Sequence, residues 1–299
     1  MDRLQAMTAF VRVVESGSFS AAARLMHLGQ PAISKAVTQL ERQLGVQLLL
    51  RSAHGLTPTD AGQRYFERVA RIVSDTEEAD AAARDSTASL QGRLRVAVPI
   101  TFGRLQIVPR LGPFLNQHPR LDIDVELDDR RVDLMAEGID VAIRVGPLND
   151  STMIAKRLGR GRRSVLATPA YLASAQALET PEDLGLHQTI GYIRDSAAKY
   201  TFRRQEEEIG ASLHTRLHLS AAEGIRAAVL ANLGLTIAAD WMFQPELACG
   251  TVVRCLTDWS LPPVDLWVVY PSGRLASAKA RAFSDYIARI VEQLEVVAV

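Results

Sequence analysis

The sequence predicts an α/β protein with three consecutive parts: a small helical head, one long helix, and a larger two-lobed α/β body. Short helical patterns fill residues 1–58. Residues 63–90 contain neither Gly nor Pro, which predicts one uninterrupted helix there. Residues 91–299 alternate strand and helix patterns, an arrangement typical of parallel sheets with right-handed crossovers. A chain of 299 residues, 47% of them hydrophobic, is long enough to form separate cores.

The charge balance excludes a strongly acidic or basic tail. The chain has 34 Lys and Arg residues against 34 Asp and Glu residues, so its formal net charge is zero. The head differs from this average, because residues 1–58 hold six basic and three acidic side chains. Such a modest basic excess suits a nucleic-acid partner without proving one.

Cysteine usage and hydropathy exclude further classes. Cys249 and Cys255 are too few for a disulfide framework or a four-ligand metal site, so we expect two reduced thiols, no metal and no cofactor. No apolar run reaches the roughly 18 residues of a membrane span. The N-terminus has no secretory signal pattern, so the predicted location is the cytoplasm and no membrane partner is expected.

Two helices joined by a tight turn are predicted within residues 18–45. Gly17 is expected to stop a preceding helix whose apolar residues recur from Leu4 to Val14. Ser20 is the expected cap of the next helix. A break at Gly29 then precedes Pro31, which suits the first position of the following helix because its missing N–H costs nothing there.

The helix that follows has two unlike faces. Its apolar stripe comprises Ile33, Ala36, Val37, Leu40 and Leu44. Its opposite face offers the candidate DNA-reading residues Gln30, Pro31, Ala32, Ser34, Lys35 and Thr38. The major groove of B-DNA admits one helix, and short side chains let its backbone approach the base edges. A helical hairpin with a merely solvated face would show a similar pattern.

The next segment favours DNA binding over that alternative. "LLLRSAHGLTPTDAG", residues 48–62, predicts a short β-ribbon followed by a helix start. Arg51, His54 and Gly55 mark the turn of this ribbon. A ribbon beside a reading helix forms a wing that touches phosphates or the minor groove, so Arg51 and His54 are candidate backbone contacts.

The run "FVRVVESGSFSAAARLMHLGQPAISKAVTQLERQLGVQLLLRSAHGLTPTDAG" resembles the LysR-type transcriptional regulators at many spaced positions in one frame. Three departures stand out. Gly29 occupies a position where the family usually has a capping Ser, and Leu49 replaces a common Phe. His54 and Gly55 replace wing residues that are often arginine, so the wing is expected to bind phosphate less strongly, or with a pH dependence set by the His54 pKa.

The resemblance implies an organisation for the whole chain. It makes residues 1–58 a winged helix-turn-helix DNA-binding domain, residues 59–90 a linker and dimerisation helix, and residues 91–299 an effector-binding domain similar in fold to periplasmic solute-binding proteins. Lobe I would span about 91–162 and 268–299, and lobe II about 163–267. The body text that resembles the family includes "RRSVLATPAYLA".

The long helix carries an apolar stripe that it cannot bury alone. Its members are Tyr65, Phe66, Val69, Ile72, Val73, Thr76, Ala79 and Ala83. A helix of about 27 residues spans roughly 40 Å. A partner helix from a second subunit would cover the stripe, and the alternative is packing on the chain's own domain. The resemblance favours the dimer, so we expect a homodimer or homotetramer.

The body elements follow in order along the chain. Strands are predicted at "GRLRVAVP", "LDIDVEL" and "IDVAIRVG", with helices at about 101–116 and within "DRRVDLMAEG". A second unit begins at "SVLATPAYL", where Thr168 and Pro169 start a helix. It continues through the strands "RLHLS" and "LTIAA" around the helix "AAEGIRAAVLANLG". The strand "VDLWVVYP" and a helix over 276–294 return to the first unit. "KRLGRGRR", residues 156–163, is expected to be a solvated basic loop.

A cleft between the lobes is the expected effector site, because ligands of open α/β sheets bind outside the carboxyl ends of the strands. The candidates there are Thr101, Phe102, Gly146, Pro147, Arg194, Ala222 and Glu223. Helix starts at Thr101 and Ala222 carry partial positive charge, so the effector is expected to be a small anionic or polar organic molecule. By resemblance, Thr101 fits the Ser or Thr that opens the family's pocket helix. Two alternatives remain: Thr101 only caps its helix, and Glu223 only complements a helix dipole.

Three classes of function compete. A sequence-specific DNA-binding transcriptional regulator, modulated by a small molecule held between two α/β lobes, accounts for both the head and the body. A secreted solute receptor conflicts with the extra head, and an enzyme conflicts with the lack of recognisable nucleophile, phosphate-loop or metal motifs. The expected partners are double-stranded DNA, the effector and a second copy of the chain, with RNA polymerase as a further candidate.

Overall fold

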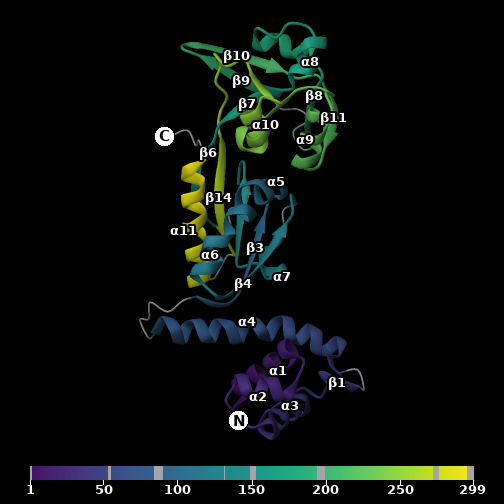
Figure 1. Ribbon diagram of the computed structural model, residues 1–299, viewed down its shortest axis with the longest axis vertical. Coiled ribbons are helices and arrows are strands. Elements are labelled where there is room, and N and C mark those ends of the chain that lie inside the picture. The colour runs from purple at the N-terminus through teal and green to yellow at the C-terminus, as the bar shows by residue number, and fades with distance from the viewer. Residues whose placement is uncertain are drawn as a thin grey trace. The chain divides into compact units, whose positions relative to one another are not determined.

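The computed structural model describes residues 2–52, 55–83, 90–130, 132–148, 153–193, 199–271 and 276–294. The chain divides into two compact units, Met1–Ala88 and Ser89–Val299, which we call the head unit and the body (Figure 1). None of the described helices combines the length and apolarity that crossing a membrane requires.

The head unit contains four helices and a two-stranded ribbon among its described residues. They are α1 (Arg3–Ser16), α2 (Phe19–Leu25), α3 (Gln30–Leu44), the antiparallel strands β1 (Leu49–Ser52) and β2 (Gly55–Pro58), and α4 (Asp60–Ala83). Phe10, Ile33 and Leu40 are fully buried where α1 and α3 meet. The ring of Phe10 lies 5.7 Å from that of Tyr65, so α4 closes the same core.

The predicted end of α1 at Gly17 is confirmed, and two other details of the helix ends differ from prediction. Gly17 and Gly45 end α1 and α3 in the left-handed conformation, with φ of 63° and 71°. Ser18 caps α2 by accepting from the Ala21 N–H, and the predicted cap Ser20 lies inside the helix. Pro31 occupies the second rather than the first position of α3, because the uncapped Gly29 is already the N-cap.

Two contacts attach the ribbon to the helices. The Glu41 carboxylate on α3 accepts from the Leu48 and Leu49 N–H groups at 2.8 and 3.1 Å. Gly62 in the first turn of α4 leaves no room for a side chain, since a Cβ there would lie 2.0 Å from the Leu48 carbonyl oxygen. The ribbon base is therefore fixed between α3 and α4.

The apolar stripe of α4 is partly covered within its own unit. Val69 and Val73 are 2% and 3% exposed in the head core, and Glu77 accepts from Arg12 of α1 at 2.7 Å. The prediction that a second subunit covers the whole stripe is therefore wrong for these two valines. Ile72 differs, because it stays 47% exposed.

The first lobe of the body is a five-stranded sheet in the order β4-β3-β5-β14-β6. Its strands are β3 (Gln91–Val98), β4 (Arg120–Leu127), β5 (Val141–Val145), β6 (Ile154–Gly161) and β14 (Val264–Tyr270). The predicted parallel pairing of β3 with β4 and β5 is confirmed, whereas β14 runs antiparallel to both β5 and β6. The parallel strands therefore end at one edge of the sheet, which positions the segments that follow them.

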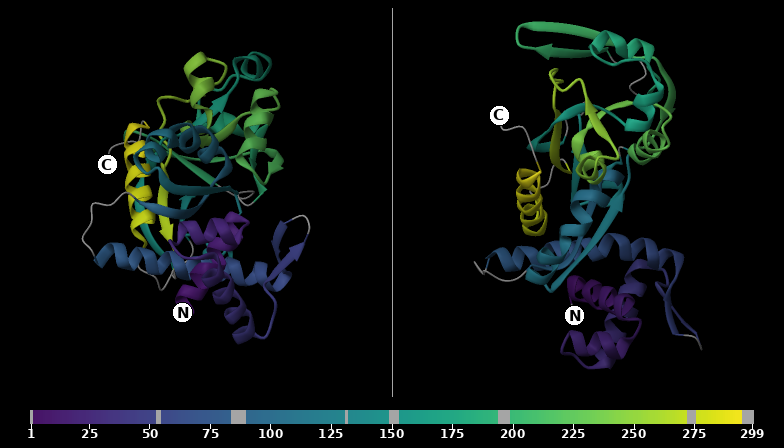
Figure 2. Two further views of the ribbon diagram at one scale, coloured as in Figure 1. Left: turned by 60° about the horizontal axis from the view of Figure 1, so that its bottom comes forward. Right: turned by 45° about the horizontal axis from the view of Figure 1, so that its top comes forward.

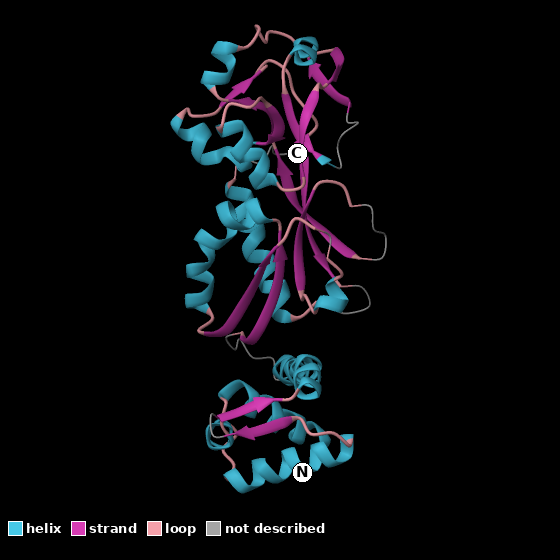
Figure 3. Ribbon diagram, turned by 90° about the vertical axis from the view of Figure 1, so that its right-hand side faces the viewer, coloured by secondary structure: helices cyan, strands magenta, loops and turns pink. Residues whose placement is uncertain are grey.

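Helices cover both faces of this sheet (Figure 3). On one face, Leu94 and Val96 pack with Phe114 of α6 (Leu111–Gln117) and Phe283 of α11 (Ala278–Gln293). On the other face, Ala97 packs with residues around α7 (Leu134–Glu137). The helical segment after β3 is irregular, because α5 (Ile100–Phe102) passes through a π turn (Gly103–Ile107) and a 3₁₀ turn (Val108–Arg110) before α6.

The basic segment 156–163 is mostly strand, so the prediction of a solvated loop is wrong. Residues 156–161 belong to β6, an edge strand paired with β14. Polar side chains on both faces hid it from a search for alternating hydrophobicity. Arg157 and Arg160 both reach Asp265 of β14, at 3.9 and 3.0 Å, so neighbouring charges stabilise this edge.

The second lobe consists of small sheets and short helices. Its elements are β7 (Arg163–Ala167), α8 (Pro169–Ser174), a 3₁₀ helix (Pro181–Leu186), β8 (Thr189–Tyr192), β9 (Lys199–Arg204), β10 (Glu207–Ser212), β11 (Thr215–Leu219), α9 (Ala222–Leu230), β12 (Thr236–Ala239), a 3₁₀ helix (Asp240–Phe243), α10 (Gln244–Cys249) and β13 (Val253–Cys255). The β9–β10 hairpin lies at the end of this lobe that is remote from the five-stranded sheet (Figures 1 and 2).

Candidate functional site

The candidate reading helix α3 presents the residues that the sequence singled out. Gln30, Pro31, Lys35 and Thr38 are exposed, and Ala32 and Ser34 are half-buried, while Ile33 and Val37 point into the core. The buried stripe therefore fixes which face of α3 remains outside. Gly29 gives α3 no side-chain cap, and the Ala32 and Ile33 N–H groups donate to the Gly29 carbonyl instead.

The wing is present as the β1–β2 ribbon. Arg51 lies in β1 opposite Leu56, and four residues separate the end of α3 from the start of the ribbon. His54, the other predicted backbone contact, lies outside the described residues. The helix-turn-helix and the ribbon thus adjoin in one small unit, as a DNA-binding head requires.

The predicted cleft residues of the body meet where β3 and β11 end. Thr101 and Phe102 belong to α5, and both are fully buried. The N-cap of α5 is Pro99, so Thr101 does not cap its helix, and its hydroxyl has no hydrogen-bond partner. An unpaired buried hydroxyl costs stability, so the position of this group calls for an explanation.

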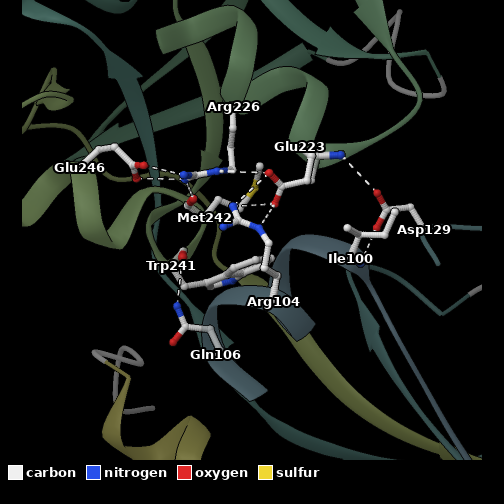
Figure 4. Close-up of polar contacts among 10 residues, drawn as sticks. Ile100, Arg104, Gln106, Asp129, Glu223, Arg226, Trp241, Met242 and Glu246 are labelled. Carbon is white, nitrogen blue, oxygen red and sulfur yellow. Dashed lines mark hydrogen bonds and ion pairs between the residues drawn. The ribbon is translucent and has the colours of Figure 1, made fainter. Parts of the chain in front are cut away.

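One carboxylate occupies both of the helix starts that the sequence assigned to an anion. Asp129 accepts from the Ile100 N–H at 3.0 Å through Oδ1 and from the Ala222 N–H at 3.3 Å through Oδ2 (Figure 4). Ile100 starts α5 in the first lobe, and Ala222 starts α9 in the second. Asp129 therefore joins the lobes and fills the electropositive position between the two helices.

A chain of alternating charges crosses between the lobes beside Asp129. Arg104 donates to both carboxylate oxygens of Glu223 at 3.0 Å, and Glu223 lies 3.8 Å from Arg226 (Figure 4). The buried Arg226 donates to the Met242 carbonyl and, at 2.5 and 3.0 Å, to Glu246. Arg104 belongs to the first lobe, and Glu223, Arg226 and Glu246 belong to the second. These four residues connect the lobes, and we call them the latch.

The electrostatics of the latch favour charged forms. Burial is the largest influence on Glu246 and would raise its pKa. The hydrogen bond with Arg226, a backbone hydrogen bond and the charges of Arg226 and Arg104 together outweigh burial and hold that pKa below its ordinary value. The carboxylate therefore stays ionised opposite a guanidinium that is only 7% exposed. Within the described part of the chain, no group of three His, Cys, Asp or Glu residues is placed to hold a metal ion.

The remaining predicted cleft residues lie at the same sheet edge or outside the described chain. Gly146 follows the carboxyl end of β5, accepts from the Trp267 indole at 3.1 Å and donates to the Asp265 carbonyl. Pro147 next to it is exposed. Arg194 lies outside the described residues. Thr101 and Phe102 of α5 thus lie near Ala222 and Glu223 of α9, whereas Gly146 is hydrogen-bonded to β14.

Residue-level reasoning missed Asp129, Arg104 and Arg226. A signal existed for Asp129, because it follows the carboxyl end of β4 as Thr101 follows that of β3. The pairing of Arg104 with Glu223 joins positions 119 apart in the chain, and no local pattern indicates it.

A reading helix with a wing, joined to a two-lobed α/β body, defines a ligand-responsive DNA-binding protein. Comparison with known proteins agrees. Residues 4–63 match the model of the bacterial regulatory helix-turn-helix proteins of the lysR family, and residues 87–291 match the LysR substrate binding domain. The chain belongs to the LysR family of transcriptional regulators.

Individual relatives span almost the whole chain. An HTH-type transcriptional regulator of Xanthomonas campestris pv. campestris is 34% identical over 283 residues, which cover 93% of this chain and 82% of the relative. PtxR of Pseudomonas aeruginosa is 33% identical, covering 94% and 90%. The solved structure of CrgA, a LysR-type regulator from Neisseria meningitidis, is similar with a TM-score of 0.58 at 27% identity, covering 97% and 98%.

These findings confirm the predicted class of function. The protein is a DNA-binding transcriptional regulator whose C-terminal domain is an effector-binding domain of the LysR type. Its relatives are transcriptional regulators, and regulators of this family bind DNA and small molecules and form oligomers.

Proposed function

We propose that α3 reads DNA through Gln30, Pro31, Ala32, Ser34, Lys35 and Thr38, and that the ribbon contacts the backbone through Arg51 and His54. The observation that carries this proposal is the exposed face of α3, where small polar groups surround one cation. Short side chains permit close approach to base edges, and Lys35 is long enough to reach a phosphate or a guanine. The functional division that we propose is residues 1–58 for DNA, 59–90 for the linker helix and 91–299 for the effector.

The effector is proposed to bind between the lobes against Thr101, Phe102, Gly146, Pro147, Arg194, Ala222 and Glu223. Its chemistry is that of a small polar or anionic organic molecule. The unpaired Thr101 hydroxyl supports a polar contact. An anionic group has to displace Asp129 from the Ile100 and Ala222 N–H groups, so binding and opening of the interlobe contacts are linked.

The proposal also covers the oligomeric state, the cellular location and a further protein partner. The protein acts as a homodimer or homotetramer in the cytoplasm, where its DNA is, and it contacts RNA polymerase as an additional partner. It has no catalytic role: the charged cleft residues Arg104 and Glu223 neutralise each other, an arrangement that serves binding rather than proton transfer.

Fluorescence anisotropy with the DNA upstream of the regulator's own gene tests the DNA-reading proposal. Lys35→Ala should weaken binding. If Lys35 contacts a phosphate, the loss is the same for all sequences and the salt slope falls by about 1. If it reads a base, discrimination at one position falls by roughly 1–3 kcal/mol. Arg289→Ala, on α11 of the body, is the matched control and should bind as the unaltered protein does. Wild-type affinity and specificity in Lys35→Ala would remove Lys35 from the interface.

A further inference from the structure

A second hollow lies apart from the proposed effector cleft, at the junction of the lobes. Its volume is about 300 Å³. Gly161 at the end of β6 and Leu266 of β14 line it from the first lobe, and Asp240, Trp241 and Arg254 line it from the second. None of the residues proposed for the cleft belongs to its lining. A volume of this size lies at the lower end of the range for small-molecule sites.

Two buried polar atoms of this junction pocket have no partner. Trp241 is only 9% exposed, and its indole Nε1–H has no hydrogen-bond acceptor. The Asp240 Oδ1 atom likewise accepts from nothing. Both atoms are closed to a water-sized molecule, so they lie beneath the lining of the hollow and a ligand there meets the surface around them.

The charges of the pocket specify the kind of ligand. Asp240 uses its other oxygen, Oδ2, for Arg254 at 2.7 Å and for Arg162 at 3.8 Å. Two guanidiniums thus share one carboxylate, which leaves the pocket with excess positive charge. Leu247, Ala248 and Leu266 supply an apolar wall on the same hollow. Arginines bind carboxylates through paired hydrogen bonds, so an organic acid with an apolar body matches this lining.

We propose that the junction pocket is a second small-molecule site, for an organic acid that carries an apolar body. Its carboxylate binds Arg162 and Arg254. Its apolar body packs against Leu247, Ala248 and Leu266.

The position of the pocket connects it with regulation. Arg162 lies on one of the two segments that cross between the lobes, and its carbonyl accepts from the Asp240 N–H at 3.0 Å. The Trp241 ring also packs edge-on against Phe102 of the proposed cleft, with 5.0 Å between centroids. A ligand in the junction pocket therefore touches both lobes and one wall of the cleft, so the two sites are coupled through their preference for one lobe arrangement.

The test uses the three tryptophans of the full chain, labelled as 5-fluorotryptophan. Trp241→Phe assigns the resonance of the pocket, and Trp267, hydrogen-bonded to Gly146, reports on the proposed cleft. Titration with 4-hydroxyphenylacetate should shift the Trp241 resonance saturably with a Kd of about 1 mM, as expected for so small a ligand. The uncharged methyl ester should bind at least about tenfold more weakly, because the arginines lose their partner.

A matched pair of variants localises the binding. Ala248 is exposed on α10 and lines the pocket, so Ala248→Phe should fill it and abolish the Trp241 shift without disturbing the core. Ala227→Phe, at an exposed position of α9 outside the lining, should leave the shift unchanged. The proposal is overturned if the acid causes no saturable Trp241 shift up to about 20 mM, roughly twenty times the expected Kd. It is equally overturned if the shift survives in Ala248→Phe, or if only Trp267 responds.

Discussion

Thr101, which we propose as an effector contact, has a hydroxyl that costs its own fold stability. Its hydroxyl is completely buried and unpaired, whereas the similarly buried Thr236 donates to the Ile190 carbonyl at 2.9 Å. The two threonines therefore differ in pairing and not in burial. An unpaired buried hydroxyl lowers the free energy of unfolding by about 1–3 kcal/mol, whereas a paired hydroxyl raises it.

Thr101→Val should raise the free energy of unfolding of the body by about 1 kcal/mol, because it removes the unpaired hydroxyl and keeps the shape. Thr236→Val is the control and should lower it by roughly 1–3 kcal/mol, since the Ile190 carbonyl loses its donor. Urea unfolding measures both. In cells, Thr101→Val should keep operator binding and lose the effector response of a reporter gene. A destabilised Thr101→Val variant would show that the hydroxyl has a partner.

The two cysteines differ in reactivity for an electrostatic reason. Burial raises the pKa of Cys255 to about 11, whereas a hydrogen bond with Thr251 lowers the pKa of the exposed Cys249. The thiolate is the reactive form, so at pH 8 only about 0.1% of Cys255 is reactive. Iodoacetamide should therefore label Cys249 first, and labelling of Cys255 should accelerate with every pH unit up to about 11. Mass spectrometry of Cys249→Ser isolates the slow site, and rapid labelling there at pH 8 would contradict the shift.

Much of the candidate site could be predicted residue by residue, and its connections could not. The exposed face of α3 follows from helical periodicity alone, because the buried stripe determines the opposite side. The carboxyl-end rule located Thr101 and Ala222. The rule does not say which side chains turn toward each other, and so the bridge of Asp129 to both helix starts depended on packing between distant segments.

At the scale of elements, the base of the wing depends on a close backbone approach. Gly62→Ala places a Cβ about 2.0 Å from the Leu48 carbonyl oxygen, so either the ribbon or the start of α4 has to move. We expect a loss of at least ~3 kcal/mol in the stability of the head, and weaker DNA binding as a consequence. The control is Gly112→Ala on α6, where an added Cβ would meet no atom of a neighbouring element within 4 Å. This substitution should raise the free energy of unfolding by about 0.5–1 kcal/mol. Urea unfolding and DNA anisotropy would check both, and an unaltered Gly62→Ala head would contradict the contact.

Elements with strong periodicity were predictable, and edge elements were not. The strands β3, β4 and β5 alternate clearly and were predicted with their parallel pairing. The edge strand β6 and the exposed hairpin β9–β10 bury few side chains, so little alternation marks them. The π and 3₁₀ turns between α5 and α6 were also not predicted. A continuous helical pattern in the sequence does not show whether the backbone hydrogen bonds are of the α, π or 3₁₀ type.

At the scale of the whole molecule, the apolar stripe of α4 has two parts: one completes the head core, and the other is proposed to contact a second subunit. Val69 and Val73 complete the head core, so they are unavailable to another subunit. Ile72 is a large apolar residue of the same helix that stays exposed, so it is available to another subunit. The proposed pairing of subunits along α4 thus depends on a narrower surface than the sequence pattern indicated.

Ile72→Asp should give a folded monomer, because it places a charge on the proposed subunit contact and leaves the head core intact. Val69→Asp should instead unfold the head, since burying an unpaired charge costs more than a small unit can tolerate. Sedimentation velocity measures the mass, and circular dichroism measures folding. A native-size oligomer of Ile72→Asp would rule out α4 as the contact that holds subunits together. A folded Val69→Asp variant would contradict its place in the core.

The contact of Asp129 with both helix starts has a consequence for the concentration to which the protein responds. A tethered group competes with free molecules at an effective concentration in the millimolar range or above. Any anionic metabolite that seeks the same N–H groups meets this resident competitor, so its induction threshold is set by Asp129 as well as by its own contacts. For an effector bound in the proposed cleft, this competition sets a threshold that an abundant metabolite reaches and a trace metabolite does not.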